Sequence, residues 1–387
     1  MGADPIFLSD DPSAQRFDAH CRRVAAWTVE LARARQLNTD EIKSLERAAL
    51  LHHNLLAVLQ GDAREHFLSD LGVHEVETEP APGGRHEILE IANALDEHFE
   101  WEPFSDHSEN DVNPAAAAAL DCLRCAGEAD LQSALRRLPV FPVAAQKALA
   151  LLTRDDWNAY DLRVVASADQ VLASEMIRAA NSWAFAPLQP IMTLPHAITY
   201  IGADHASKIL LAASLKPLFA SPKLGEIWNH ALEASEAAQC IAKLSGRVHP
   251  EQAFLAGLVH DIGRLAMALL PPEFQRRSAR LLEKGCELML VERALCGSSH
   301  AELGAAALRQ WGFPDTLIDA VRFHHEPDLS DSALASVLYL AERCTNPWED
   351  LPSIVRRTAA MNRLGLQHEA LSSVDRSSKL DGLRYSR

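Results

Sequence analysis

Apolar residues recur every three or four positions along most of this chain, which is the spacing of one face of an α-helix. The clearest case is "EQAFLAGLVHDIGRLAMALL", residues 251–270, where Phe254, Leu258, Ile262 and Leu265 belong to one broad apolar face. The same period marks segments 20–36, 41–56, 144–152, 170–181, 205–219, 231–245, 302–311 and 332–344. Alternating runs of β-branched residues are scarce. The pattern predicts an all-α, multi-helical protein.

Three stretches interrupt this periodicity and predict how the chain is divided. Residues 77–86 and 101–114 combine proline, glycine and charge and are expected to be loops. The polar chain from about 366 is expected to be poorly ordered beyond any short helix. A boundary is placed near 128–136, so that 1–130 is one helical unit and 131–350 a second domain. The second domain has halves 131–220 and 221–350, and 351–387 is a tail.

The acidic net charge of the chain limits the kinds of molecule that it is expected to bind. The chain has 37 basic and 53 acidic residues and a formal net charge of −16, which argues against nucleic-acid binding and against a polybasic membrane anchor. No apolar run approaches the ~18 residues of a membrane helix, and the start "MGADPIFLSDDPSAQ" does not resemble a signal peptide. We therefore expect a cytoplasmic protein without nucleic-acid or membrane partners.

The cysteine pattern favours free thiols. Seven cysteines are scattered along the chain, and Cys122 and Cys125 form one CxxC, "CLRC". A structural zinc site usually needs a second such pair or added histidines, and no second pair exists. Two ordinary thiols are the favoured interpretation, with zinc as the lesser alternative.

The segment 251–270 also carries a histidine and an aspartate side by side. Ala253, Ala256, Gly257, His260 and Gly263 project opposite the apolar face, so small residues surround the histidine and leave space for something other than bulk water. Asp261 lies at the flank of the apolar face, where a carboxylate is costly unless it is hydrogen-bonded, paired or metal-bound. A helix cap or a buried polar pair is the favoured interpretation for such a pair on its own.

The pair is accompanied by further candidate ligands on other predicted helices. Histidine and carboxylate are the ligand types for Fe, Mn, Zn or Ni, and these positions could converge on a centre of one or two metals that activates water for phosphoester hydrolysis. The candidates are His230, His260, Asp261, His300, His324, His325 and Glu342.

This order of ligands resembles the metal-dependent HD phosphohydrolase superfamily, and above all its HDOD ("HD-related output domain") branch. "LPVFPVAAQKALALLTRDDWNAYDLRVVASADQVLASEMIRAANSWAF" and "TLPHAITYIGADHASKILLAASL" resemble the amino-terminal half of that domain, within 138–219, and residues 226–344 resemble its HD-like half. The resemblance implies an all-helical HDOD-like bundle. It also implies non-enzymatic signal transduction in bacteria, often beside cyclic-di-GMP or two-component elements.

The histidines and Asp261 also match the ligand positions of the catalytic HD-GYP phosphodiesterases, and Glu226 matches an accessory carboxylate of some of them. Three features depart from that branch. Arg264 replaces the lysine of "HDIGK", Glu342 replaces a ligating aspartate, and "HHEPDLSDSALAS" lacks the GYP segment. The resemblance therefore implies little cyclic-di-GMP hydrolysis, even if metal binds.

The amino-terminal region repeats part of this pattern. "HCRRVAAWTVELARARQLNTDEIKSLERAALLHHNLL", residues 20–56, parallels "HALEASEAAQCIAKLSGRVHPEQAFLAGLVHDIGRLA", residues 230–266. His53 stands at the aspartate position, so we interpret 1–130 as a degenerate HD-like unit that serves as a sensor or docking element. The alternative is two unrelated amphipathic helices.

The leading hypothesis is a cytoplasmic signalling regulator that acts through protein–protein contacts of an HDOD domain. The first alternative is a metal-dependent phosphohydrolase. The second is a pseudoenzyme that senses a metal or a nucleotide in its pocket. The sequence identifies neither the signalling partner nor the oligomeric state.

Overall fold

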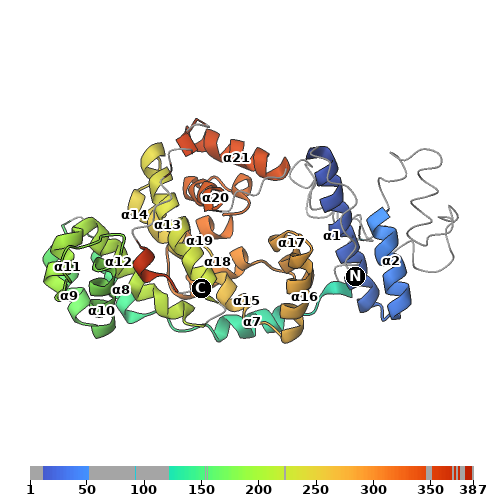
Figure 1. Ribbon diagram of the computed structural model, residues 1–387, viewed down its shortest axis with the longest axis horizontal. Helices are drawn as coiled ribbons and strands as arrows, with labels where there is room; N and C mark the ends of the chain where they lie inside the picture. The colour runs from blue at the N-terminus through green and yellow to red at the C-terminus, as the bar shows by residue number, and fades with distance from the viewer. Residues whose placement is uncertain are drawn as a thin grey trace. The chain divides into compact units, whose positions relative to one another are not determined.

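The computed structural model describes residues 12–51, 92, 122–152, 154, 156–221, 224–345, 351–367, 370, 371, 374 and 380–385. Every regular element among these residues is an α- or 3-10 helix (Figure 1), which confirms the all-α prediction. The chain divides into two compact units, one made of residues 1–131 and 270–299 and the other of 132–269 and 300–387. The predicted loops at 77–86 and 101–114 lie outside the described residues.

The first unit joins amino-terminal helices to a helical pair from much later in the chain. Its helices are α1 (Pro12–Ala34), α2 (Thr39–Leu51), α16 (Pro272–Glu283) and α17 (Leu288–Cys296), and α7 (Glu128–Arg136) spans the division between the units. The division within α7 falls where the sequence predicted a boundary. Residues 270–299, however, group with the amino-terminal unit, so the predicted domain limits stay a proposal.

A buried carboxylate holds α1 to α16. Glu30 is almost fully buried, and its Oε2 accepts a 2.9 Å hydrogen bond from Arg277 Nε while its Oε1 accepts one of 2.9 Å from Arg280 Nε. Arg277 Nη1 also donates to the carbonyl of Leu123 at 2.8 Å. A charge removed from water is tolerated only when it is paired and hydrogen-bonded, and Glu30 meets both conditions.

The second unit begins with a cluster of short helices. They are α8 (Val143–Leu152), α9 (Ala159–Ser167), α10 (Gln170–Ala180), α11 (Leu194–Ile201), α12 (Ala203–Leu215) and the 3-10 helix η2 (Lys216–Phe219). Side chains of Asn158, Asp169 and Thr193 cap the first turns of α9, α10 and α11. Asn181 ends α10, and its side chain makes two hydrogen bonds to the backbone of Ile191, which fixes the α10–α11 loop.

The rest of the second unit carries the candidate ligands. Its helices are α13 (Gly225–Ser245), α14 (Pro250–Val259), α15 (Gly263–Met267), α18 (His300–Gln310), α19 (Asp315–Arg322), η4 (Pro327–Leu329), α20 (Ala333–Thr345), α21 (Leu351–Leu364) and η6 (Asp381–Leu383). Helix α13 packs along both α14 and α20, and α18 packs against α15 and α19 (Figure 1). Trp228 of α13 is fully buried in this core.

The chain beyond residue 350 is not a simple polar tail. Helix α21 packs on α20, and Leu380 and Leu383 of the carboxy-terminal segment are buried. Within the stretch expected to be poorly ordered beyond any short helix, residues 381–383 form the short helix η6. The polar sequence of this stretch gives no sign that the two leucines are buried, because a pair of isolated apolar residues shows no period.

No helix of the described residues is both long and apolar enough to cross a membrane.

Candidate metal centre

His260 and Asp261 lie at a break between two helices. Helix α14 ends at Val259 and α15 begins at Gly263. Across the break the backbone bonds span three residues, from Ile262 N to Val259 O and from Arg264 N to Asp261 O, at 3.0 Å each. The single helix expected over 251–270 is therefore wrong, because a tighter 3-10 turn with helix-like torsions replaces its middle.

Two glycines beside this turn allow backbones to approach closely. A Cβ added to Gly257 would lie 2.4 Å from Ser235 Cα on α13, and one added to Gly263 would lie 1.9 Å from the carbonyl oxygen of His300. The space that the small residues predicted around His260 is thus filled by the chain itself. Both contacts bring ligand-bearing elements together, since α13 carries His230 and α18 begins at His300.

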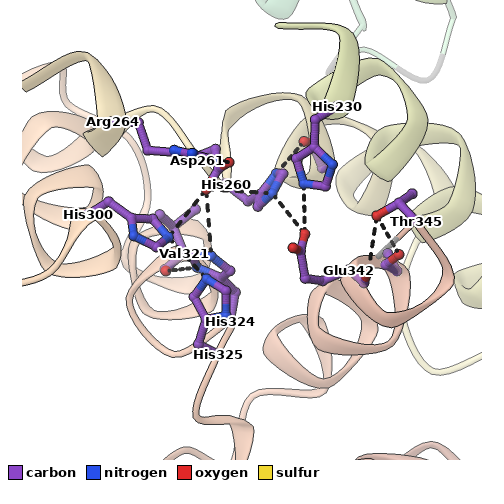
Figure 2. Close-up of polar contacts among 12 residues, drawn as sticks. His230, His260, Asp261, Arg264, His300, Val321, His324, His325, Glu342 and Thr345 are labelled. Carbon is purple, nitrogen blue, oxygen red and sulfur yellow. Dashed lines mark hydrogen bonds and ion pairs between the residues drawn. The ribbon is translucent and has the colours of Figure 1, made fainter. Parts of the chain in front are cut away.

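Seven of the eight predicted ligands come together from five parts of the fold (Figure 2). They come from α13, the α14–α15 turn, the start of α18, the residues after α19, and α20. Their ligand atoms form three overlapping groups, within each of which all atoms lie within 4.8 Å: His230, His260 and Glu342; His260, Asp261 and His324; and His300, His324 and His325. Glu226 is exposed and belongs to none of these groups.

Glu342 links two of the histidines. Its Oε2 accepts a 2.8 Å hydrogen bond from His230 Nε2 and lies 3.5 Å from His260 Nε2. Burial favours the neutral acid, but these two histidines outweigh it and hold the pKa of Glu342 well below its usual range. Burial lowers the pKa of His230, yet the hydrogen bond and charge of Glu342 raise it to about 9. A metal ion bound here would have to displace the proton of His230.

Asp261 lies at the middle of the cluster. Its Oδ2 accepts a 2.9 Å hydrogen bond from Arg264 Nη1, while its Oδ1 lies 3.3 Å from His300 Nε2, 3.8 Å from His260 Nε2 and 4.0 Å from His324 Nε2. Burial would raise the pKa of Asp261, but Arg264 and the surrounding histidines hold it well below its usual range. Asp261 is therefore an ionised carboxylate with one oxygen directed at the histidines.

Backbone carbonyls fix the tautomers of two buried histidines. The Nδ1–H of His260 donates to Gly257 O at 2.8 Å, and that of His324 donates to Val321 O at 2.6 Å (Figure 2). Burial, together with His260 and His300, lowers the pKa of His324 to about 3. Burial, His324 and His300 likewise hold the pKa of His325 well below its usual range. These lowered pKa values keep the rings of His324 and His325 neutral, and the bond from Nδ1–H of His324 leaves its lone pair on Nε2.

That arrangement fits a metal ion. The Nε2 atoms of His260 and His324 are buried and have no hydrogen-bond partner among the described residues. An unsatisfied buried acceptor costs about 1–3 kcal/mol, so a protein rarely keeps two of them side by side without a further role. A cation beside the Asp261 carboxylate would satisfy both. A carbonyl that fixes Nδ1–H so that Nε2 can ligate is common in metal sites.

The carbonyls of Gly257 and Val321 were not predicted from the sequence. The only signal for them is that each lies three residues before a candidate ligand. Cys122 and Cys125 are free thiols outside every ligand group of the described residues, and His20 also lies outside these groups. His52 and His53 lie outside the described residues.

Comparison with known proteins gives a family match. Residues 138–327 match the HDOD domain family. An HDOD domain protein from Geobacter sulfurreducens aligns with 64% of this chain and 90% of its own, with 22% identity and a TM-score of 0.53. A proposed phosphohydrolase from Shewanella amazonensis SB2B aligns with 66% of this chain and 95% of its own, with 23% identity and a TM-score of 0.51. At these identities the two structures support the fold.

An uncharacterised protein of Treponema pallidum is 21% identical over 228 residues, which are 56% of this chain and 44% of that protein. The chain spans less than half the length of the curated relatives it matches. The family match and the shared fold confirm the resemblance drawn from the sequence, and residues 138–327 of this chain are an HDOD domain.

Proposed function

We propose that this chain is a cytoplasmic bacterial signalling regulator whose HDOD domain acts by contact with protein partners and holds one or two divalent transition-metal ions. Fe, Mn, Zn and Ni are the candidate metals, because the donor set is imidazole and carboxylate. Membership of the HDOD family supports a regulatory role. The observation that carries the metal part is the pair of buried Nε2 atoms of His260 and His324. Neither has a hydrogen-bond partner among the described residues, although carboxylate oxygens lie within 4.0 Å of both.

The ligands are assigned to two ions as follows. One ion is held by His230, His260 and Glu342, and the other by His300, His324 and His325. Asp261 is a ligand to one of the two ions or to both. A bound ion would supply positive charge that fixes five parts of the domain in one arrangement and could polarise a water molecule. Glu226 is left out of this assignment because its side chain is exposed.

Contact with proteins is supported by exposed apolar side chains on the first half of the domain. Trp183, Leu188 and Met192 lie in the α10–α11 loop and expose at least 74% of their surface, and Tyr200 on α11 is also exposed. Asn181 holds this loop in one conformation, so the side chains are presented by a defined backbone. Clustered exposed apolar groups of this kind are typical of interaction sites. The net charge of −16 favours a partner with basic surface over nucleic acid.

The amino-terminal part, within residues 1–130, is proposed as the sensor or docking element. The buried ion pairs of Glu30 with Arg277 and Arg280 support it, because they join α1 to a segment inserted between the turn that carries Asp261 and the helix that begins at His300.

Metal-dependent phosphodiester hydrolysis is the second candidate. It is favoured by the complete set of histidines around an ionised Asp261. It is opposed by Arg264, which occupies one oxygen of that carboxylate, and by the residues after His325, where the GYP segment of the catalytic branch is absent. A pseudoenzyme that uses the same centre as a metal sensor is compatible with the leading proposal.

One comparison separates these functions. The full chain and its His260→Ala/Asp261→Ala and Trp183→Ser/Leu188→Ser variants would be tested for capture of cellular proteins and for Mn²⁺-supported hydrolysis of cyclic-di-GMP and of a chromogenic phosphodiester. The proposal predicts specific capture that the Trp183→Ser/Leu188→Ser variant loses, with little or no hydrolysis. Robust hydrolysis that disappears in Asp261→Asn, without any specific capture, would favour the enzyme instead.

A further inference from the structure

We infer that two segments beyond the HDOD family match are positioning elements for the candidate metal centre. Helix α21 holds its His324–His325 end, and residues 380–385 hold its His230 end. The inference rests on the proposed metal site for its function, but not for its structural test. It is argued from two independent sets of contacts.

Helix α21 fastens the chain directly after His325. Arg363 Nη1 donates to the carbonyl of Pro327 at 2.6 Å and to Ser336 Oγ on α20 at 3.1 Å. About two turns earlier on α21, Arg356 Nε lies 3.1 Å from Asp328 Oδ1. Arg363 and Arg356 of α21 thus hold the backbone and a side chain of η4. This 3-10 helix begins two residues after His325. The carbonyl of Pro327 and the helix α20 are joined through a single guanidinium.

The contact of α21 with η4 affects the ligand group that contains His324 and His325. His324 and His325 lie between α19 and η4, in a stretch without regular secondary structure. Their rings contact His300 and each other, with 3.0 Å between His300 Nε2 and His325 Nε2. Because the stretch has no helix of its own, its position depends on the bond from His324 to the end of α19 and on what holds η4. Arg363 is therefore a positioning residue for the group of His300, His324 and His325.

The carboxy-terminal segment 380–385 lies along α13 immediately before His230. Trp228 Nε1 donates to Leu383 O at 3.0 Å. The side chain of Asn229 makes two hydrogen bonds to the backbone of Tyr385. Asn229 Nδ2 donates to Tyr385 O at 3.1 Å, and Asn229 Oδ1 accepts from Tyr385 N at 2.9 Å. The side chains of Leu380 and Leu383 are buried beneath these bonds.

The same segment also contacts the first half of the HDOD domain. An added Cβ on Gly382 would lie 3.0 Å from Ala179 Cα of α10, so the segment lies directly on that helix. Tyr385 Oη donates to Lys216 O of η2 at 3.2 Å, and the ammonium of Lys216 lies 4.9 Å from the centre of the Tyr385 ring. Residues 380–385 therefore join α10 and η2 to the start of α13, which fixes where His230 stands.

The two contacts predict separable effects on metal binding. Arg363→Met should lower affinity at the His300–His324–His325 group, and Asn229→Ala/Leu383→Ala should lower affinity at the His230–His260–Glu342 group. Groups that orient metal ligands typically contribute about 10- to 100-fold in affinity, so a loss of about 10-fold at one site of two is expected. Arg309→Met, an exposed cation on α18, is the charge-matched control and should leave both affinities unchanged.

The experiment uses the full chain with two readouts. Competition with a fluorescent chelator gives the affinity of each Zn²⁺ equivalent, and hydrogen–deuterium exchange follows peptides covering 321–329 and 226–233. We expect faster exchange only in 321–329 for Arg363→Met and only in 226–233 for Asn229→Ala/Leu383→Ala. Exchange and affinity equal to wild type in both folded variants would overturn the inference. Should Arg363→Met fail to fold, Arg363→Lys and Ser336→Ala replace it with the same expected direction.

The outcome separates the inference from the proposed function. If the wild-type chain binds no metal, the proposed metal site fails, while the exchange pattern still decides whether α21 and 380–385 position the two ends. A cross-link tests the contact between residues 380–385 and α13 directly. A Cβ added at Gly225 would lie 3.3 Å from Tyr385 Cβ, close to the ~3.5–4.5 Å that separates the two Cβ atoms of a disulfide. Gly225→Cys/Tyr385→Cys should form a disulfide with diamide as oxidant and keep its metal; a failure to cross-link would overturn the docking of 380–385.

Discussion

Arg264 Nη1 lies 2.9 Å from Asp261 Oδ2, so one of the two oxygens of the central carboxylate is already engaged by a cation. The other oxygen, Oδ1, lies within 4.0 Å of the Nε2 atoms of three histidines. Arginine keeps its charge at any accessible pH, so this pairing does not relax as a lysine could. The centre is thus arranged to bind a cation through one oxygen of Asp261 and to limit the use of the second.

Arg264→Met should lower the Tm of the metal-free protein and should increase the rise in Tm on adding metal. The substitution removes the partner of a buried carboxylate, so the metal-free Tm should fall. A bound cation would then supply the missing charge and could use both oxygens, so the Tm increase on adding Mn²⁺ should exceed that of wild type. Thermal unfolding with and without Mn²⁺ measures both. An equal Mn²⁺-induced increase in the two proteins would show that Arg264 does not compete with the metal.

Glu30 is expected to be a main determinant of the attachment of α1 to α16. Glu30→Ala leaves Arg277 buried without its carboxylate, and removal of one partner of a buried ion pair typically costs about 3 kcal/mol or more. Urea unfolding gives the change in free energy. Glu283→Gln, at an exposed carboxylate on α16, is the matched control and should change stability by less than about 0.5 kcal/mol. A Glu30→Ala protein as stable as the control would show that the ion pair adds nothing.

The same residue predicts a pH dependence. Burial would raise the pKa of Glu30, but its bonds to Arg280 and Arg277 outweigh burial and lower it. A carboxylate whose pKa is lower in the folded state stabilises the fold above its unfolded pKa, about 4.3, and this stabilisation is lost as the pH falls through the folded value. The stability difference between wild type and Glu30→Gln should therefore be largest at neutral pH and shrink below about pH 4.5. A difference that grows in acid would contradict the assignment.

The amino-terminal histidines should play no part in metal binding. His20 lies outside every ligand group of the described residues, and the aspartate position of the repeat is His53. His20→Ala and His52→Ala/His53→Ala should therefore leave the metal content per chain unchanged, as elemental analysis of the purified variants can measure. A loss of metal in His52→Ala/His53→Ala would instead reveal a second working site.

Helical periodicity predicted the fold class and much of the helical content, including α13, α18 and α20. Helices whose sequences are short or mixed were missed, among them α11 (Leu194–Ile201), α17 (Leu288–Cys296) and α19 (Asp315–Arg322). The ligand set could be proposed because histidine is scarce on apolar helix faces and the order of ligands matched a family. Its convergence could not be derived, since contacts such as Gly263 with His300 depend on tertiary packing.

The break at His260–Asp261 shows why local pattern was insufficient. Apolar residues continue in helical register on both sides, so periodicity gives no sign of the 3-10 turn. The role of residues 380–385 was equally hidden, because two isolated leucines show no period and the segment's hydrogen bonds to Trp228 and Asn229 join residues far apart in the sequence.

Elemental analysis of the wild-type chain and of His260→Ala/Asp261→Ala, both purified without chelator, tests the central claim most directly. The double variant removes one buried Nε2 that has no hydrogen-bond partner among the described residues, and it also removes the carboxylate at the middle of the cluster. The account predicts one or two transition-metal ions per wild-type chain and a loss of at least one in the double variant. Wild-type protein without metal above trace, or the same metal content in both proteins, would contradict it.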